Sequence, residues 1–468
     1  MGIFTAILEE GLYQVDKVLN SINKELIPED INNNYNDKFI GSKEIVNTAN
    51  TGFCCDGINY LPSSTANFLV TGNSGVGKSS VIAHTLLGNT ENNYIINDCS
   101  GELSTSAGVL YDANFDIKIT NFSRPEISNG FFNPLKYVDS DSSIYKLSHQ
   151  IAHEELGKDR DKYWMIQACN LLGLNIRALR YQDPKYFNLT NVRHVIEMLS
   201  GANTSLVDKI IIDTKNDSII NAYKSFISND PKLKSNIISS TLACLSIWND
   251  SNIQQITSFD SLDLHNIHYN KYAIFIQTDV LQSSYYRLLV SLLLKTVITE
   301  IMTELPNATT RRTLLLLDEF ASGLYIPDFD IIISTIRKYR AHLCLIIQSY
   351  SQLQSQYGDK IARTIITNCA SRLYFSSLDF ETASSLSNEL GKYSHMMDSS
   401  MKIRELLTPS EIRQLSADKA ILLYSNMNPI LLNLRPCYTQ PLLMRRLKKK
   451  FDYPRFNVNK IIPLIGYS

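Results

Sequence analysis

The stretch TGNSGVGKSS, residues 71–80, decides the fold of this 468-residue chain. Two glycines five residues apart are followed by Lys78 and Ser79, which is the pattern G-x-x-x-x-G-K-[ST] of a phosphate-binding loop. NFLVTG (67–72) leads into the loop with the composition of a buried strand, and the residues after it predict a helix. A strand, a glycine-rich turn and a helix form the context that this motif requires. The sequence therefore predicts a nucleoside triphosphate site.

The residues of this loop have separate predicted roles. Glycines let backbone N–H groups turn toward phosphate oxygens, and the helix N-terminus adds partial positive charge. Lys78 is expected to reach the β- and γ-phosphates of ATP, and the Ser79 hydroxyl to ligate Mg²⁺. The alternative is a chance glycine turn before a helix. The residues expected to contact the nucleotide are Gly72, Asn73, Ser74, Gly75, Val76, Gly77, Lys78, Ser79 and Ser80.

TLLLLDEF (313–320) supplies the second half of such a site. Its four leucines predict a fully buried strand, and Asp318 follows at the carboxyl end, where open α/β sheets bind ligands. We expect Asp318 to hold Mg²⁺ together with Ser79, and Glu319 to be the catalytic base that orients the attacking water. The alternative is an acidic pair that caps the next helix.

A third strand, HLCLIIQSY (342–350), places Gln348 at its carboxyl end. A glutamine there can sense the γ-phosphate through a hydrogen bond. A polar strand end that faces water is an equally good interpretation of this residue alone.

The composition is that of a globular protein. Hydrophobic residues make up 44% and charged residues 19%, and Lys+Arg 45 against Asp+Glu 46 leaves a net charge of −1. The bulk charge does not indicate a strongly basic nucleic-acid binder, although it does not exclude a channel that is locally basic. Eight scattered cysteines without a C-x-x-C pair indicate free thiols in a reducing compartment.

No apolar run of about 18 or more residues occurs. The most apolar stretch, YYRLLVSLLLKTVITEIM (285–302), is interrupted by Arg287, Lys295 and Glu300, and therefore predicts a buried helix. We expect a cytoplasmic protein.

Strands and helices alternate on both sides of a helical block, which predicts an α/β fold with a mostly parallel sheet and an inserted all-α domain. Further strands are expected at 93–98, 115–122, 272–280 and 371–377, and a hairpin at 419–436. The expected divisions are a helical segment and linker at 1–60, the nucleotide-binding domain at 61–141 and 263–440, the all-α domain at 142–262, and a basic C-terminal tail at 441–468.

His149 and His153 stand four residues apart on an expected helix. Gln150 occupies the place of the general base in H-E-x-x-H, so a solvated helix face is expected here and not zinc.

The motifs taken in order resemble one family. DEFASG (318–323) and IIQSYSQLQSQYG (346–358) resemble the Walker B motif and the Q-S-x-x-Q-L-x-x-x-Y-G signature of type IV secretion coupling proteins, the TraG/TraD group. The resemblance runs from about residue 60 to residue 440. Five shorter segments support it in family order: NDCSGEL (97–103), FFNPL (131–135), DKYW (161–164), SLSNELGKYS (385–394) and LLTPSEIRQL (406–415).

This resemblance implies a RecA-like P-loop ATPase that assembles as a homohexamer around a central channel. It implies ATP hydrolysis at subunit interfaces with an arginine supplied in trans, for which Arg337 is the first candidate and Arg340 the second. The alternative for IRKYR (336–340) is a basic helix end on the surface. The implied function is to recruit a relaxase bound to single-stranded DNA, or a protein, and to pump it into a type IV secretion channel.

Three departures from the family pattern stand out. The sequence shows no N-terminal transmembrane helices, so membrane docking is expected only through a partner among the inner-membrane secretion components. Ser100 replaces the lysine of D-P-K-G, and no long C-terminal extension follows the fold. The N-terminal helix is one candidate docking surface, and packing on the protein's own ATPase domain is the alternative for that helix.

Two other functions remain as alternatives. One is another hexameric DNA translocase of the same superfamily, for packaging or segregation. The other is a structural adaptor that binds nucleotide and pumps nothing, against which Lys78, Ser79, Asp318 and Glu319 argue.

Overall fold

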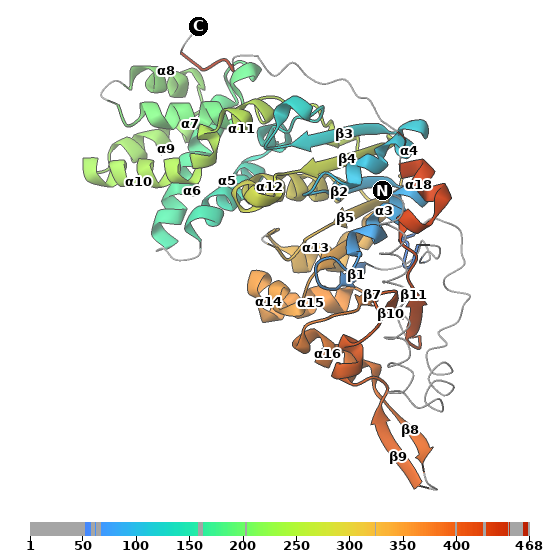
Figure 1. Ribbon diagram of the computed structural model, residues 1–468. Coiled ribbons are helices and arrows are strands. Elements are labelled where there is room, and N and C mark those ends of the chain that lie inside the picture. Colours follow the sequence, from blue (N-terminus) through green and yellow to red (C-terminus); the bar gives the residue numbers. More distant parts are fainter. Residues whose placement is uncertain are drawn as a thin grey trace, which may run out of the picture.

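The fold is described from a computed structural model of the whole chain (Figure 1). The N-terminal helix and the linker expected before residue 52 lie outside the described residues. The structure describes residues 52–57, 61, 67–157, 162–201, 204–322, 324–397, 400–424, 427–447, 449 and 462–466.

A nine-stranded sheet in the order β11-β10-β7-β1-β6-β5-β2-β4-β3 forms the centre of the molecule. The strands from β7 to β3 are parallel, and β10 and β11 continue the sheet as an antiparallel hairpin beside β7. The strands are β1 (Phe68–Thr71), β2 (Asn93–Asn97), β3 (Asp116–Asn121), β4 (Tyr272–Gln277), β5 (Thr313–Leu317), β6 (Ala341–Ile347), β7 (Ser371–Phe375), β10 (Lys419–Tyr424) and β11 (Ile430–Asn433). The α/β fold with a mostly parallel sheet is confirmed.

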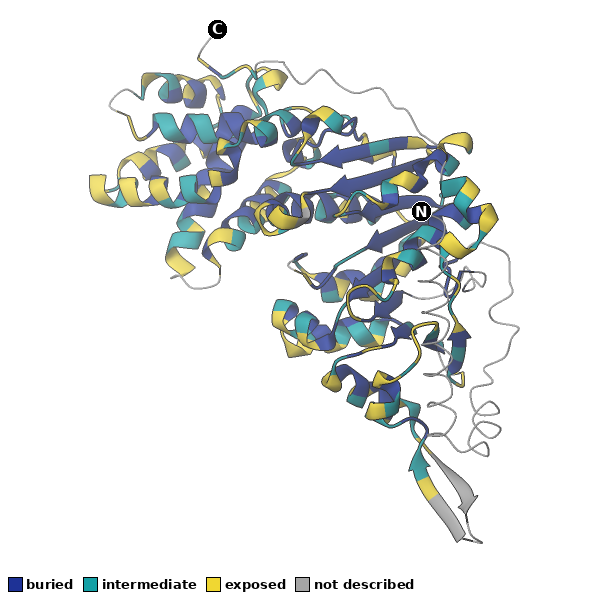
Figure 2. Ribbon diagram, viewed as in Figure 1, coloured by how far each residue is buried: buried dark blue, intermediate teal, exposed yellow. Residues whose placement is uncertain are grey.

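Both faces of this sheet are covered. Neighbouring residues of each strand point to opposite sides, and each side contributes to an apolar core. In β1, Phe68 and Val70 belong to one apolar core, whereas Leu69 belongs to the other. Figure 2 shows the central strands buried over their length. Strands buried on both faces require continuous apolar runs, and for this reason the leucines of 314–317 predict their strand so well.

Helices from separate parts of the chain cover the two faces. On one side α3 (Lys78–Gly88) and α4 (Ala107–Asp112) pack with α18 (Pro441–Leu447). The other helices that follow the central strands are α12 (Ser283–Ile301), α13 (Phe329–Thr335), α14 (Tyr350–Tyr357), α15 (Asp359–Asn368) and α16 (Phe380–Leu390), and α17 (Pro409–Arg413) packs on α16.

An all-α domain is inserted between the neighbouring strands β3 and β4, as expected (Figure 1). Its apolar core is continuous with one face of the sheet, because α5 packs on α12. The helices of the domain are α5 (Asp141–Leu156), α6 (Lys162–Leu179), α7 (Leu189–Met198), α8 (Ser205–Asp213), α9 (Asp217–Ile227), α10 (Pro231–Cys244) and α11 (Ser251–Ile256).

One element was not expected from the sequence. Strands β8 (Lys392–Met397) and β9 (Ser400–Glu405) form a separate antiparallel hairpin that extends away from the sheet below α16 (Figure 1). None of the helices in the described ranges has both the length and the apolar character needed to cross a membrane.

Candidate phosphate-binding site

The glycine-rich loop joins the carboxyl end of β1 to the first turn of α3, as the motif predicts. Gly75 and Gly77 have φ angles of 83° and 92°, which a side chain would strain. Gly72 packs closely, since a Cβ there would lie 2.8 Å from Cβ of Phe375. The loop therefore depends on glycine for its backbone shape at two positions and for its packing at a third.

Lys78 lies inside this loop and not on the surface. It is 5% exposed, and its Nζ donates a 2.7 Å hydrogen bond to the carbonyl oxygen of Asn73. Burial lowers the pKa of Lys78, and the nearby Glu319 and Asp318 carboxylates oppose that shift. The ammonium group is thus held where an anion that enters the loop would meet it.

Ser79 and Asp318 meet across the site. The Ser79 hydroxyl donates a 2.7 Å hydrogen bond to Oδ2 of Asp318, which directly follows β5. Burial raises the pKa of Asp318, and the hydrogen bond from Ser79 partly offsets this effect. The two oxygens come from motifs 239 residues apart, and they are the ligand type that Mg²⁺ prefers.

Glu319 follows with a left-handed backbone, φ 52°, which is uncommon for a residue other than glycine. Its carboxylate accepts hydrogen bonds from Nε2 of Gln348 at 3.0 and 3.2 Å and from the Ser322 hydroxyl at 2.6 Å. Gln348 therefore binds Glu319, and its side chain is half-buried.

The next contributors lie at the ends of β2 and β4. Asn97 and Asp98 belong to NDCSGEL (97–103), which supports the family resemblance, but no site role was expected for them or for Gln277. Asn97 donates a 2.9 Å hydrogen bond from Nδ2 to the backbone oxygen of Asp318. Asp98 accepts hydrogen bonds from the backbone of Leu103 and Ser104 and from Nε2 of Gln277. The bond from Asn97 braces the backbone at Asp318, and the bonds to Asp98 fix the segment that follows β2. They depend on strand order, which a single sequence does not reveal.

The loop opens on a cavity of about 680 Å³. It is lined by the loop and α3, by the segment that follows β11, and by parts of 55–57 and 102–106. Among its lining residues, Asp418, Arg435 and Tyr438 come from the end of the second part of the nucleotide-binding domain, and the sequence predicted no site role for them. The cavity is large enough for a nucleotide beside the phosphate loop.

The two arginine candidates lie far from the loop of their own chain. They belong to or follow η9 (Ile336–Tyr339) at the amino end of β6, whereas the loop follows the carboxyl end of the parallel strand β1. Arg340 donates hydrogen bonds to the carbonyl oxygens of Asn307 and Thr310, while Arg337 is exposed. Neither arginine can serve the site of its own subunit.

The expectation of a solvated face at His149 and His153 was wrong. Both side chains are half-buried, and their rings form a row with Tyr145 and Tyr325 at centroid distances of 5.8–6.1 Å. The loop that carries Tyr325 packs on α5, a tertiary contact that helix periodicity does not show. In the described part of the chain, no group of three or more His, Cys, Asp or Glu side chains could hold a metal ion.

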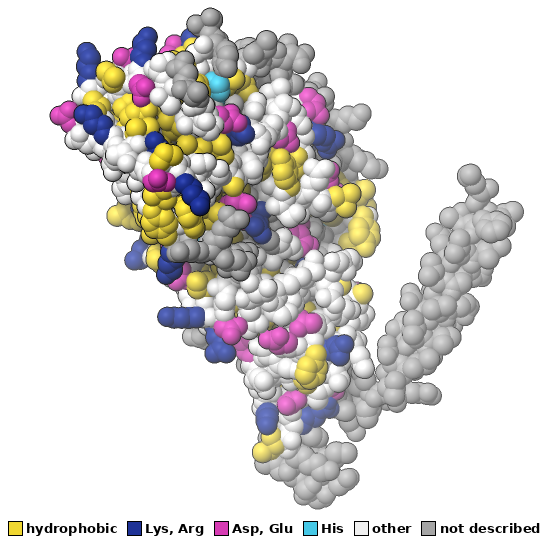
Figure 3. Space-filling view, turned by 90° about the vertical axis from the view of Figure 1, so that its left-hand side faces the viewer, with side chains coloured by type: hydrophobic (Ala, Val, Ile, Leu, Met, Phe, Trp, Pro, Cys, Tyr) yellow, Lys and Arg dark blue, Asp and Glu magenta, His cyan; other side chains and the backbone are white. Residues whose placement is uncertain are grey.

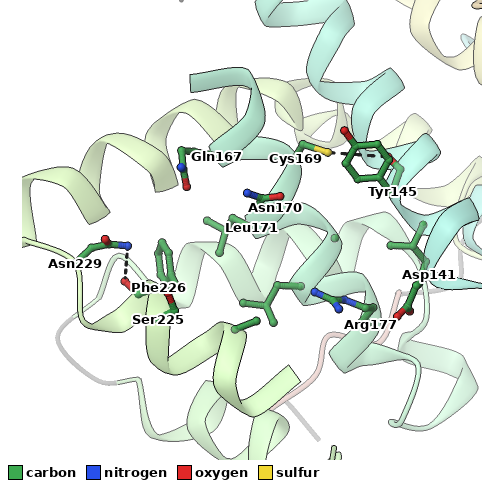
Figure 4. A pocket seen from close by; sticks show the side chains of 14 residues that line it. Asp141, Tyr145, Gln167, Cys169, Asn170, Leu171, Arg177, Ser225, Phe226 and Asn229 are labelled. Carbon is green, nitrogen blue, oxygen red and sulfur yellow. Dashed lines mark hydrogen bonds between the residues drawn. The ribbon is translucent and has the colours of Figure 1, made fainter. Parts of the chain in front are cut away.

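A second hollow lies in the all-α domain and is separate from the phosphate loop. It has a volume of about 430 Å³ and is lined by α5, α6 and α9, with Tyr145, Cys169 and Phe226 around it (Figure 4). Figure 3 shows hydrophobic side chains gathered over this face of the molecule. The exposed apolar residues of the domain include Tyr145, Tyr163, Ile166, Tyr181, Ile212 and Ile227.

Comparison with known proteins gives consistent results. The chain is 22% identical to Protein VirD4 of Rhizobium rhizogenes and 23% identical to Protein VirD4 of Agrobacterium fabrum (strain C58 / ATCC 33970), over 263 residues in each case. Each match covers 52% of this chain, and the chain spans only 39% of each relative's length.

Two solved structures show the same fold. They are the plasmid coupling protein TrwB in complex with the GTP analogue GDPNP and the same protein in complex with ADP and Mg²⁺, both with a TM-score of 0.68. Their sequence identities are 19% and 18%, and each match covers 84% of this chain and 91% of the TrwB chain. The RecA-like architecture expected from the resemblance is thereby confirmed.

The family model for conjugative DNA transfer by the type IV secretory system matches residues 23–453, which is most of the chain. This chain therefore belongs to the type IV secretory system conjugative DNA transfer family.

Proposed function

We propose that this protein is an ATP-driven coupling protein, which recruits a relaxase–DNA or protein substrate and pumps it into a type IV secretion channel. The observation that carries the proposal is the assembled site. Ser79 contacts Asp318 at 2.7 Å, and Gln348 holds Glu319 beside them, in a chain of the conjugative transfer family.

ATP would bind with its phosphates in the loop from Gly72 to Ser80 and its nucleoside in the adjoining 680 Å³ cavity. Lys78 would contact the β- and γ-phosphates. Ser79 and Asp318 would hold Mg²⁺, which, when bound, offsets negative charge on the phosphates. The donor set fits this ion, because a hydroxyl and a carboxylate oxygen already meet at 2.7 Å.

Glu319 would accept a proton from the water that attacks the γ-phosphorus, while the bond to the β-phosphate oxygen breaks. Gln348 would keep the Glu319 carboxylate aimed at that water. The TrwB complexes with ADP and Mg²⁺ and with GDPNP support nucleotide use by this fold.

The remaining chemistry would come from a neighbouring subunit of a homohexamer. Arg337 is the preferred arginine in trans, because it is exposed and Arg340 is occupied by two carbonyl groups. Mixing two inactive variants, Arg337→Ala and Glu319→Gln, should restore part of the ATPase activity, since some interfaces then combine an intact arginine with an intact glutamate. A mixture without any recovery would exclude Arg337.

The partners would be single-stranded DNA with its relaxase and the inner-membrane components of the secretion system, at the inner face of the membrane. The proposal is tested by ATPase assays with and without single- and double-stranded DNA, with particle size measured in parallel. We expect stimulation by single-stranded DNA together with ring formation, and no turnover in Lys78→Ala. Stimulation by double-stranded DNA alone would instead indicate a packaging or segregation motor.

A further inference from the structure

Residues 462–466 lie on the all-α domain, although α18, shortly before them in the sequence, packs on the nucleotide-binding domain. They contact α7 through a buried amide. Nδ2 of Asn191 donates to the carbonyl oxygen of Pro463 at 3.1 Å, and Oδ1 of Asn191 accepts from the backbone N–H of Ile465 at 2.9 Å. One side chain thus satisfies a donor and an acceptor of the segment's backbone.

The start of helix α7 fixes the orientation of the Asn191 side chain. It is 0% exposed, and Oδ1 of Asn188, which caps the start of α7, accepts hydrogen bonds from both its backbone N–H and its Nδ2. His194, one turn further along α7, also hydrogen-bonds the backbone at Ile465. Without the segment, Oδ1 of Asn191 would lose the donor at Ile465, and Nδ2 would keep only Asn188; an unsatisfied acceptor is unfavourable in an apolar interior.

Side chains of the segment enter the domain as well. Ile465 is 6% exposed and belongs to the main apolar core. Gly466 has φ 92°, and a Cβ at this position would lie 2.3 Å from Cδ2 of Leu206 on α8. Leu464 lines a cavity of about 250 Å³ together with Trp248. The site therefore recognises backbone groups, the apolar side chains of Leu464 and Ile465, and one obligatory glycine.

The other end of this C-terminal region is fixed on the nucleotide-binding domain. Nη1 of Arg446 in α18 donates a 2.8 Å hydrogen bond to the carbonyl oxygen of Leu87 at the end of α3, and Lys449 forms an ion pair with Asp112 of α4. The C-terminal region is thus anchored at two places: Arg446 and Lys449 contact the nucleotide-binding domain, and residues 462–466 contact the inserted domain.

We propose that α7, α8 and the η6–α11 turn (η6, Ser246–Asn249) form a binding site for an extended apolar peptide, and that residues 462–466 of the same chain occupy it as a strap tying the all-α domain to the nucleotide-binding domain. Occupation of this site requires neither ATP hydrolysis nor DNA. In this site Asn191 has a peptide-recognition role.

The test uses a fluorescein-labelled peptide, IIPLIGYS, with the sequence of residues 461–468. The chain shortened to end at Ile461 should bind this peptide, whereas the full chain should bind it at least tenfold more weakly, because its own segment competes at high effective concentration. Equal binding to the two proteins, or no binding to a folded shortened chain, would overturn the proposal.

Two variants test the contacts. Asn191→Ala in the shortened chain should weaken peptide binding about tenfold through the loss of two hydrogen bonds, and the matched control Asn221→Ala, on the exposed part of α9, should leave it unchanged. A peptide with valine in place of Gly466 should also bind about tenfold more weakly, and this variant places no demand on protein folding. If the valine peptide binds as well as the native one, the assigned groove is wrong.

Amide hydrogen exchange distinguishes a strap within one subunit from one between subunits. In the full chain, protection of the Ile465 amide should be unchanged on dilution to monomers. Protection that disappears on dilution would place the segment on a neighbouring copy and would overturn the intramolecular strap.

Discussion

Nε2 of Gln348, at the end of β6, lies 3.0 Å from Oε2 and 3.2 Å from Oε1 of Glu319, at the end of β5. One amide group thus spans both oxygens of the carboxylate. The bond joins neighbouring strands of the sheet, so any movement of β6 relative to β5 changes the direction of the Glu319 carboxylate. This pair couples the direction of the Glu319 carboxylate to the neighbouring strand.

Glu319→Gln should stop turnover and keep nucleotide binding. The substitution removes the carboxylate that we propose as the base, and it leaves Ser79 and Asp318 in place as the proposed ligands for Mg²⁺. We expect kcat to fall by about 100-fold or more, with the nucleotide Kd from isothermal titration unchanged. Glu126→Gln, at an exposed position, is the control. Full turnover in Glu319→Gln would remove this residue as the base.

Gln348→Ala should lower kcat by about 10- to 100-fold with little change in KM for ATP, because a misdirected base slows the chemical step. Gln352→Ala is the matched control, since Nε2 of Gln352 reaches Oε1 of Gln348 only at 3.4 Å. Steady-state kinetics separate the two effects. A raised KM with normal kcat would show that Gln348 binds nucleotide and does not position Glu319.

Asp318→Asn should stabilise the nucleotide-free protein and abolish its response to Mg²⁺. Because burial raises the pKa of Asp318, its charge costs stability at neutral pH, and this cost vanishes as the pH falls and both folded and unfolded states become protonated. Asparagine removes the charge and can still accept the hydrogen bond from Ser79. We expect Tm to rise by about 2–4 °C at pH 7 and the advantage to shrink in acid. A lower Tm at pH 7 would contradict the assigned cost of burial.

As the pH is lowered, binding of Mg²⁺ with nucleotide should begin to weaken at a higher pH than it would if Asp318 had the pKa of an ordinary aspartate. Acidification through the raised pKa of Asp318 protonates this ligand. Since Mg²⁺ competes with the proton, a tenfold increase in Mg²⁺ should move the midpoint of the acid limb to lower pH. Titration of the nucleotide Kd against pH at two Mg²⁺ concentrations measures the shift. Identical midpoints at the two Mg²⁺ concentrations would show that the loss of nucleotide binding in acid does not come from protonation of a Mg²⁺ ligand.

Removal of residues 145–260 should leave a nucleotide-binding domain of lower stability. All strands of the main sheet lie outside this range, but the cut removes the 3.1 Å hydrogen bond from Gln150 to Ser291 and the ion pair of Glu154 with Arg287. It also exposes the face of α12 that packs on α5. Calorimetry should show a lower Tm with nucleotide binding retained. A folded deletion protein that binds no nucleotide would show that the inserted domain supports the site itself.

The sequence predicts the central strands and the phosphate loop well, because both are local patterns. A strand buried on both faces needs an uninterrupted apolar run, as in TLLLL, and the loop needs its glycines at defined spacing. The meeting of Ser79 with Asp318 could be anticipated from the motif pair alone.

Other features depend on contacts between distant parts of the chain. Asn97 reaches Asp318 only because β2 and β5 are neighbours in the sheet, and Gln277 reaches Asp98 only because β2 and β4 are neighbours. The segments of β8 and β9 carry no Asn-Gly or Gly-rich two-residue turn signal, so the hairpin was missed. Asn191 resembles any helix asparagine until residues 462–466 lie beside it. The assignments of Lys78, Glu319, Gln348 and Arg337 to catalysis remain predictions.

The order of strands in the sheet also has a consequence for biosynthesis. The first strand, β1, lies between β6 and β7, and Asn67 beside it bonds to Leu343, which is 276 residues later in the chain. The inserted helices, by contrast, pack mainly on one another within a short length of sequence. On the ribosome, the all-α domain can fold early, whereas β1 must wait for the last third of the chain and keeps its apolar surface exposed until then. Chaperone demand during translation should therefore arise from β1 and β2 and not from the inserted domain.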